Sequence, residues 1–494
     1  MIIKEKKYSS YKIQNNHFNK IIMLFILIFF IFTIGYVSAN YGIIGKLITP
    51  IKNTTKISYN YLSSFTTPSK KIYLNVKFED YDKLENFKTE AFEKGALFKN
   101  KNSFVNASLL HEGKTYQSKL RLKGRGLDHL QGDKWSFRIK IKDDEKLFGM
   151  KQFSLQSPRV RNFLYEWFYH EVLGFENIFK LDYIFVNLTF NGKNLGTYAL
   201  EEHFHWQNLL RKINDPGPII KFDENHSWKE SYQLESFEGS KGSGYGLFSS
   251  SPIESYQTDY FLSDTSKKVF LLNALQRLDD FRRGDLKTSE VFNVDKLAKY
   301  FAINDLLGTE HGSRWNNARF YFDAKTALLE PIGFDGNNST VYNNRTIKYL
   351  SATKEGIYVN RPLENKKNSY FAILFSDNNF YKKYVQFLEH LSNPIYLDYL
   401  FDKLETEIDY NLILIHKTYP NFDFNKNTFY NNQRYIREIL DPEEALICFQ
   451  KEFENDTVIL TLGNLQSLPV EILGLKIGDT PYISISEEYV HTNT

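Results

Sequence analysis

The sequence predicts an α+β protein with a β-rich first half, a helical second half and a short β-rich end, behind an apolar N-terminal segment. Apolar and polar residues alternate with a period of two along several stretches before residue 222, and the alternation returns after residue 441. Between these parts, apolar residues recur mostly at helical spacing. Apolar residues make up 42% of the 494 residues and charged residues 24%, which excludes a mainly disordered or a polytopic membrane protein.

The N-terminal segment combines a basic flank with an apolar stretch. Residues 1–20 carry five lysines against one glutamate, and no charged side chain occurs from Ile21 to Gly45. This pattern is typical of a helix whose N-terminus stays in the cytoplasm, so residues 21–38 are expected to be a transmembrane anchor. Because Val37-Ser38-Ala39 resembles a cleavage site, a removable signal peptide is the alternative. Either places the main domain outside the cytoplasm, with residues 39–71 as a spacer.

Residues 72–222 are expected to form the β-rich unit. Helices are predicted over Asp80–Gly95, Arg159–Val172 and Glu201–Ile213. Strands are predicted over Ile72–Phe78, Phe104–Leu110, Thr115–Lys123, Trp135–Lys142, Tyr183–Phe190 and Lys193–Leu200. Asn191-Gly192 is a strong two-residue hairpin signal. In Trp135–Lys142 the polar side includes Arg138 and Lys140, which predicts a half-buried strand with a basic outer face.

Residues 223–440 are expected to be mainly helical and residues 441–494 to form a small β module. A Ser-, Gly- and Tyr-rich stretch at Glu224–Asp259 is expected to be a long surface insertion. Helices are predicted over Lys267–Phe281, Val291–Leu307, Tyr381–His416 with a break near Asn393-Pro394, and Phe429–Leu440. Short strands are predicted over Ala318–Phe322, Leu328–Ile332, Val458–Leu462, Val470–Leu475 and Tyr482–Ile485.

Cationic residues gather around two glycines in the β-rich unit. Arg121 and Lys123 share one face of a predicted strand, and Lys134 begins the returning strand. Gly124 and Gly126 lie between them and permit a tight turn. Such a loop can cradle phosphates, because backbone N–H groups and fixed cations meet the same oxygens. The alternative is a solvated basic face of a sheet.

Two further clusters carry acidic and amide side chains. Glu202 lies where a strand is expected to give way to a helix, although a carboxylate there can be an ordinary surface or capping residue. Glu310 and His311 open a polar loop that contains Asn316, and Asp335 follows in a Gly-flanked turn. A base that aligns a hydroxyl, with amide and carboxylate oxygens that hold Mg²⁺, makes up a phosphoryl-transfer site. Asp335 alone can equally be a turn former.

Taken together, these motifs resemble the spore-coat-protein-H (CotH) kinase family from about residue 72 to residue 337. The resemblance rests on the R-x-K-G of Arg121–Gly124, the LFGMKQFSLQSP segment at 147–158, the N-G-x-x-x-G-x-Y-x-x-x-E run that ends at Glu202, Lys221, and the H-x-x-x-x-N and F-D-G pair. It implies an atypical protein-kinase-like core with two lobes. The β-rich N-lobe would be residues 72–222 and the helical C-lobe residues 223–440. It also implies ATP and Mg²⁺ as cofactors.

The resemblance also implies roles for individual residues. Asn316 and Asp335 would bind the metal, and five residues would contact the nucleotide: Arg121, Lys123, Lys134, Glu202 and Lys221. Trp315, beside the expected metal ligand, is a further candidate nucleotide contact. The family usually has Asp five positions before the Asn, whereas this chain has His311 there; if Asn317 is the match, Gly312 takes that position. His311 or Glu310 would then orient the acceptor hydroxyl. Trp315 would stack on adenine, or alternatively only pack.

The sequence therefore favours an envelope-anchored kinase that transfers phosphate from ATP to a hydroxyl on a protein or glycan. The alternative is a catalytically weakened scaffold protein in envelope or coat assembly, with an unrelated carbohydrate-active protein as a third possibility. A net charge of +3 gives no indication of nucleic acid as a partner. One cysteine, Cys448, excludes an intrachain disulfide and a Cys-rich zinc site. The kinase interpretation requires Lys134 and Asp335 to share one cavity.

Overall fold

The computed structural model describes residues 23–29, 33, 43–98, 103–209, 212, 217–225, 248–337, 370–454, 457–466, 468, 470–476, 478–479 and 483–490. Its two compact units are residues 1–66 with 419–421, and residues 67–418 with 422–494. The predicted flank at 1–20, and all of the predicted anchor except 23–29 and 33, lie outside the described residues. None of the helices that the structure describes combines the length and apolarity of a membrane span.

The first unit contains the helix α2 (Ile43–Ser64), which occupies most of the predicted spacer. Asn60 near its end donates a side-chain hydrogen bond of 3.0 Å to the carbonyl of Pro420. The spacer therefore has regular structure, which the Asn- and Thr-rich sequence did not indicate.

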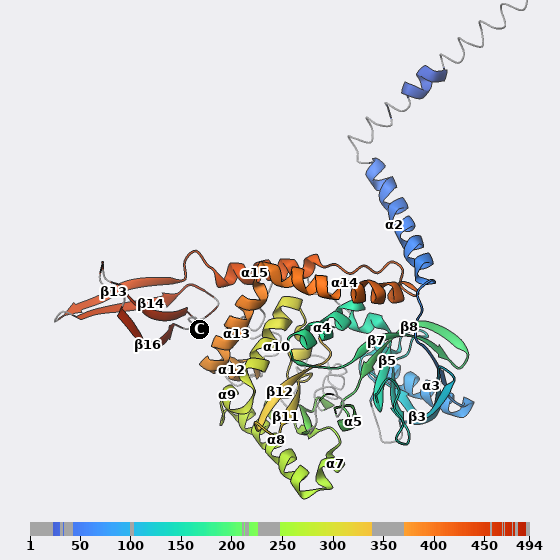
Figure 1. Ribbon diagram of the computed structural model, residues 1–494, viewed down its shortest axis with the longest axis horizontal. Helices are drawn as coiled ribbons and strands as arrows, with labels where there is room; N and C mark the ends of the chain where they lie inside the picture. Colours follow the sequence, from blue (N-terminus) through green and yellow to red (C-terminus); the bar gives the residue numbers. More distant parts are fainter. Residues whose placement is uncertain are drawn as a thin grey trace, which may run out of the picture. The chain divides into compact units, whose positions relative to one another are not determined.

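A closed seven-stranded barrel forms the β-rich part of the second unit (Figure 1). Its strands, in spatial order, are β1 (Lys71–Asn75), β2 (Val105–His111), β3 (Lys114–Leu122), β4 (Phe137–Ile141), β5 (Gln152–Gln156), β8 (Lys193–Glu202) and β7 (Tyr183–Phe190). Large apolar side chains such as Phe137, Phe153 and Leu200 fill its core. The predicted hairpin is confirmed, since Asn191 and Gly192 have φ of 45° and 82°, which suits a tight β7–β8 turn.

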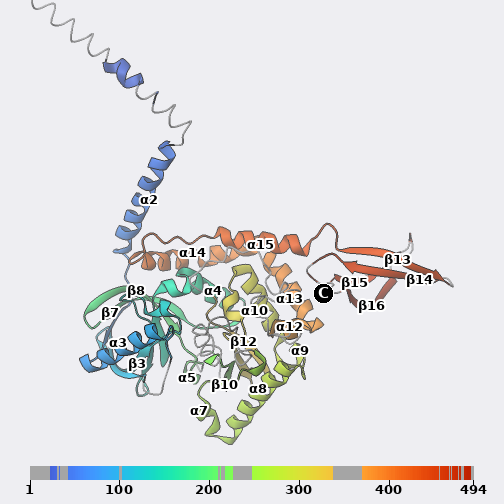
Figure 2. The ribbon, with the colours of Figure 1, turned by 180° about the vertical axis from the view of Figure 1, so that it is seen from behind.

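A second sheet of five strands follows the barrel, in the order β10 (Ile253–Ser255), β9 (Ile219–Phe222), β11 (Arg319–Asp323), β12 (Leu328–Gly333) and β6 (Phe179–Lys180). The helices of this part, also seen from behind in Figure 2, are α4 (Leu164–Phe175), α7 (Thr258–Leu262), α8 (Thr265–Arg283), α9 (Thr288–Val291), α10 (Val294–Leu307), α12 (Tyr370–Phe375), α13 (Asn378–Ser392), α14 (Pro394–His416) and α15 (Asn427–Leu440). The predicted break at Asn393-Pro394 is confirmed, because Asn393 caps α14.

The C-terminal strands form two antiparallel pairs, β13 (Leu446–Glu454) with β14 (Thr457–Asn464) and β15 (Val470–Leu475) with β16 (Ile483–Val490). The helix α3 (Phe78–Glu93) packs beside the barrel strands β2 and β3 and matches its prediction. The chain is thus a mixed α and β protein, as expected. In the predicted insertion Glu224–Asp259, β10 and the start of α7 are regular, and residues 226–247 lie outside the described part.

Two predicted helix boundaries are wrong. The helix predicted from Glu201 starts later, because the strand β8 continues through Glu202. The helix α5 covers only Trp206–Leu209. The helix expected from Arg159 starts at Leu164, because a 3₁₀ turn, η2 (Pro158–Arg161), comes first. Asn162 and Phe163 then adopt φ of 54° and 56°, so the backbone reverses before α4 begins.

Candidate functional site

A row of polar side chains crosses four adjacent barrel strands. The pairing of β3, β4, β5 and β8 places four residues side by side in register: Arg121, Arg138, Ser154 and Glu201. Because side chains alternate across a strand, this row lies on the barrel's outer face, opposite its apolar core. Arg138, Ser154 and Glu201 are nonetheless at most 5% exposed. The alternative of a solvated basic face is therefore wrong at Arg138, because this side chain lies on the outer face but is buried in a cavity wall.

Lys123 extends this row just beyond β3 and forms a buried ion pair. Its Nζ lies 2.7 Å from Oε2 of Glu201 and also donates a hydrogen bond to the side-chain oxygen of Gln156. Burial lowers the pKa of Lys123 to about 8, although the neighbouring carboxylate of Glu201 acts in the opposite direction. The pKa of Glu201 is lowered, since Lys123 and Arg161 together outweigh its burial. This pair holds a cation in a fixed position at the base of the cavity described below.

Asp335 follows β12 in a left-handed turn with φ of 56° and is buried. Its Oδ1 lies 2.7 Å from Nε of Arg161 and 3.3 Å from Nδ1 of His311. Burial alone would raise the pKa of Asp335, but the guanidinium of Arg161, together with His311, holds it well below its usual range. Asp335 is therefore a carboxylate anion at neutral pH, which is the form that binds a metal.

Helix α4 fixes the turn that carries Asp335. Oε1 of Glu166 accepts a hydrogen bond from the backbone N–H of Gly336 at 3.2 Å, and Oε2 accepts one from the backbone N–H of Asn337 at 2.8 Å. Glu166 is fully buried. A buried carboxylate on a helix thus determines where the backbone after Asp335 runs.

Gly336 allows this turn to lie against helix α4, which gives a test of the packing. A Cβ atom at Gly336 would lie 2.6 Å from the ring of Tyr169. We expect Gly336→Ala to lower the free energy of unfolding by about 1–3 kcal/mol, because the ring or the turn must move. Chemical denaturation of the two proteins measures this difference. An unchanged midpoint would show that the turn is not packed against Tyr169.

Arg121 and Arg138 of the row, Lys123 of the ion pair and Asp335 of the turn line one cavity of about 510 Å³, a usual size for a small-molecule site. Its wall includes seven Lys or Arg side chains against four Asp or Glu side chains, which favours an anionic ligand. The cations are Arg121, Lys123, Arg125, Arg138, Arg161, Lys221 and Arg319, and the acids are Asp128, Asp223, Glu224 and Asp335.

Six of the ten predicted site residues line this cavity: Arg121, Lys123, Lys221, His311, Asn316 and Asp335. Asn317, the alternative to Asn316, lines it too. The cavity wall therefore joins residues of the first predicted cluster to residues of the third.

The other four residues are placed differently. Lys134 precedes β4, donates to the carbonyl of Thr197 at 3.3 Å and does not line the cavity, so the expected sharing with Asp335 is not found. Glu202 lies on the opposite face of β8 from Glu201 and pairs with Lys212 at 2.6 Å. Trp315 contacts the ring of Phe222 at the edge, with centroids 6.5 Å apart. The side chain of Glu310 lies outside the described part of the structure.

Sequence reasoning missed Arg138 and Arg161, which line the cavity. It also missed Glu201 and Glu166, which hold Lys123 and the turn after Asp335. The period-two alternation along β8 was a signal for Glu201, because it places Glu201 on the face opposite Leu200. No comparable signal marked Arg161 and Glu166, which were expected on an ordinary helix.

His311 gives the site a dependence on pH. Burial would lower its pKa, but Asp335 outweighs burial and raises the pKa above the usual value of about 6.5. A group whose pKa is higher in the folded than in the unfolded protein stabilises the fold fully at pH values below its unfolded-state pKa. This stabilisation is lost as the pH rises through its folded-state pKa. We expect metal-free protein to lose stability over this window, and His311→Gln to lack that loss. Thermal unfolding at several pH values, from 5.5 to 8.5, measures it, and parallel curves would contradict it.

A family model described as CotH kinase protein matches residues 120–442, which is most of the chain and includes every residue of the cavity wall named above. No curated protein matches the chain. The family match indicates a kinase-like function.

Proposed function

We propose that this chain, which belongs to the CotH kinase protein family, transfers phosphate from ATP to a hydroxyl group of a protein or glycan. In this proposal the barrel serves as the N-lobe and the mainly helical part from about residue 223 as the C-lobe of a kinase-like core. The cavity between Arg138 and Asp335 would hold the nucleotide.

Arg138 supports the proposal most strongly. It is 5% exposed and lines the cavity, and its Nε and Nη1 atoms have no hydrogen-bond partner among the described residues. Buried N–H groups without partners are costly, and phosphate oxygens are suitable acceptors for a guanidinium. Arg121 and Lys123 lie beside it and would contact the same phosphates.

Oxygen donors in the same cavity suit Mg²⁺. Asp335 is held as an anion, and Asn316 or Asn317 offers an amide oxygen on the same cavity wall. Carboxylate and amide oxygens are the protein ligands that Mg²⁺ prefers. A bound Mg²⁺ would neutralise charge on the phosphates, while Asp335 and the Asn orient them. Arg161 would keep Asp335 in place.

His311 would align the acceptor hydroxyl and take up its proton. Its Nδ1 lies 2.9 Å from the carbonyl oxygen of Asp335, which fixes the ring beside the carboxylate turn. Neutral imidazole is a competent base, although a carboxylate at this position would be the usual choice in the family.

A second candidate is a catalytically weakened scaffold that binds the nucleotide without transferring phosphate. It is favoured by the occurrence of His311, rather than Asp, five positions before Asn316. For both candidates we propose an envelope location, with residues 21–38 as anchor or cleaved signal and the main domain outside the cytoplasm.

The experiment measures binding of a fluorescent ATP analogue and phosphate transfer to envelope proteins by the full chain, with and without Mg²⁺. Arg138→Gln should weaken nucleotide binding about 10- to 100-fold, because it removes a charge-assisted contact. Lys119→Gln is the matched control, since Lys119 is an exposed cation on the neighbouring strand. Binding without transfer would favour the scaffold, and no binding at all would contradict both candidates.

A further inference from the structure

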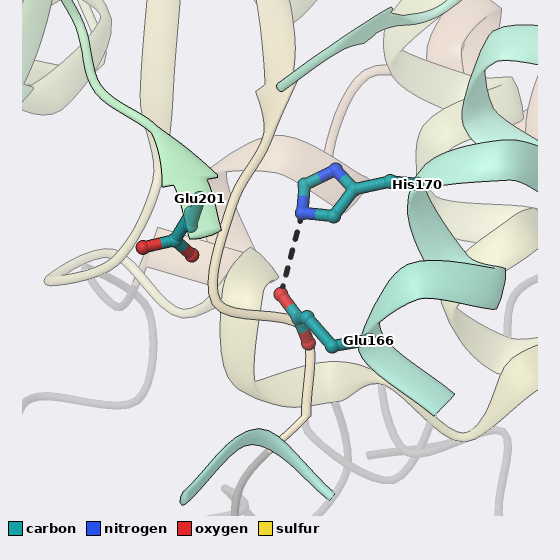
Figure 3. A group of neighbouring side chains, drawn as sticks. All are labelled: Glu166, His170 and Glu201. Carbon is teal, nitrogen blue, oxygen red and sulfur yellow. Dashed lines mark ion pairs between the residues drawn. The ribbon is translucent and has the colours of Figure 1, made fainter. Parts of the chain in front are cut away.

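Three buried ionisable side chains converge behind the cavity. Glu166 and His170 lie one turn apart on helix α4, and Glu201 faces them from the end of β8 (Figure 3). One potential ligand atom from each lies within 4.8 Å of the other two. All three side chains are fully buried.

The described structure leaves this cluster incompletely partnered. Neither ring nitrogen of His170 makes a hydrogen bond to a described residue; its Nε2 lies 3.5 Å from Oε1 of Glu166. Oε1 of Glu201 also has no hydrogen-bond partner there, since Lys123 occupies Oε2. Buried polar atoms of this kind usually have a partner, so these atoms point to a ligand that sits between them.

We propose that Glu166, His170 and Glu201 bind a divalent transition-metal ion, of the Zn²⁺ or Mn²⁺ class, at a site separate from the Mg²⁺ site at Asp335. One imidazole nitrogen and two carboxylate oxygens form a ligand set that suits these ions, whereas Mg²⁺ prefers oxygen ligands alone. With metal–ligand bonds of about 2.1 Å, tetrahedral ligands lie about 3.4 Å apart. The three side chains need to close by little more than 1 Å.

This metal would join parts of the cavity wall that belong to different elements. Glu166 holds the backbone N–H groups of Gly336 and Asn337, next to Asp335. Glu201 holds Lys123. A metal between Glu166 and Glu201 would therefore fix the Asp335 turn relative to Lys123. The site goes beyond the proposed phosphate transfer, because metal binding needs neither nucleotide nor acceptor.

A cluster of the three side chains that holds no ion is the competing explanation. The two explanations differ in what the protein retains after purification. Only the metal site predicts a stoichiometric ion that survives dialysis.

The test is elemental analysis of the full chain without nucleotide, as purified and after chelation followed by separate addition of Zn²⁺, Mn²⁺ or Mg²⁺. We expect about one equivalent of Zn²⁺ or Mn²⁺ per chain to remain after dialysis, and no retained Mg²⁺ at this site. Glu166→Gln and His170→Gln should each lower the affinity at least 10-fold. Glu171→Gln should not, because Glu171 lies on the same helix but pairs with Lys180 instead.

If the variants do not fold, X-ray absorption spectroscopy of the wild-type protein is the second measurement. We expect its spectrum to show one imidazole and oxygen atoms as ligands of the metal. The proposal is overturned if the wild type retains no stoichiometric ion, if the ion persists in both variants, or if the absorption shows no imidazole. Failure of phosphate transfer with the ion still bound would contradict the proposed function and not this site.

Discussion

Asp335→Asn should lower phosphate transfer by roughly 10³-fold while the protein still folds, because loss of one fixed charge at a transition state has an effect of this order. Asn keeps the size of the side chain but removes the anion that Arg161 and His311 hold ionised. The metal would lose its charged ligand, and the phosphates would lose part of their neutralisation. Transfer from radiolabelled ATP under saturating nucleotide measures the effect.

The same substitution leaves Arg161 buried beside a neutral partner, so stability must be measured in parallel. Arg161 is 8% exposed. A matched control is Asp128→Asn, which alters another carboxylate of the cavity wall and leaves Arg161 paired. A folded Asp335→Asn protein with unchanged transfer would remove Asp335 from the mechanism, and an equal loss in Asp128→Asn would indicate a general effect of charge.

Sequence patterns correctly predicted those elements that are determined by residues adjacent in the chain. The Asn191-Gly192 turn, the helix break at Asn393-Pro394 and the β-rich C-terminal end all depend on neighbouring residues, and each occurs in the structure. Glu201 and Glu202 show the limit. Both follow a strong strand pattern, but the point where the strand ends was placed two residues too early, at Leu200 instead of Glu202, and the motif drew attention to the wrong carboxylate.

The rest of the site depends on what packs over the barrel. Period-two alternation correctly places Arg138 on the outer face of β4, yet the alternation contains no information about whether that face meets solvent or another element. Arg161 reaches Asp335 only because the chain forms a 3₁₀ turn and then reverses at Asn162 and Phe163. Such a reversal depends on tertiary packing, which the periodicity of apolar residues along the chain does not reveal. The helical periodicity therefore predicted an uninterrupted helix from Arg159.

The buried pair of Lys123 and Glu201 should be the most sensitive ion pair of the cavity. Lys123→Met is expected to lower the free energy of unfolding by about 3–5 kcal/mol, because the carboxylate of Glu201 stays buried with its closest cation removed. Both side chains are at most 6% exposed, so water cannot replace the missing cation. Denaturant titration monitored by tryptophan fluorescence measures the change, and the exposed pair of Lys193 and Asp133 provides the control.

The double variant Lys123→Met with Glu201→Gln distinguishes the cost of an unpaired charge from the loss of packing. If the unpaired carboxylate causes most of the loss, removing its charge should restore a large part of the stability, since neutral groups of similar volume often replace a buried ion pair at little cost. A double-mutant cycle then gives the coupling between the two side chains. Additive losses would show that the two residues act independently, and that the 2.7 Å contact does not hold the cation in place.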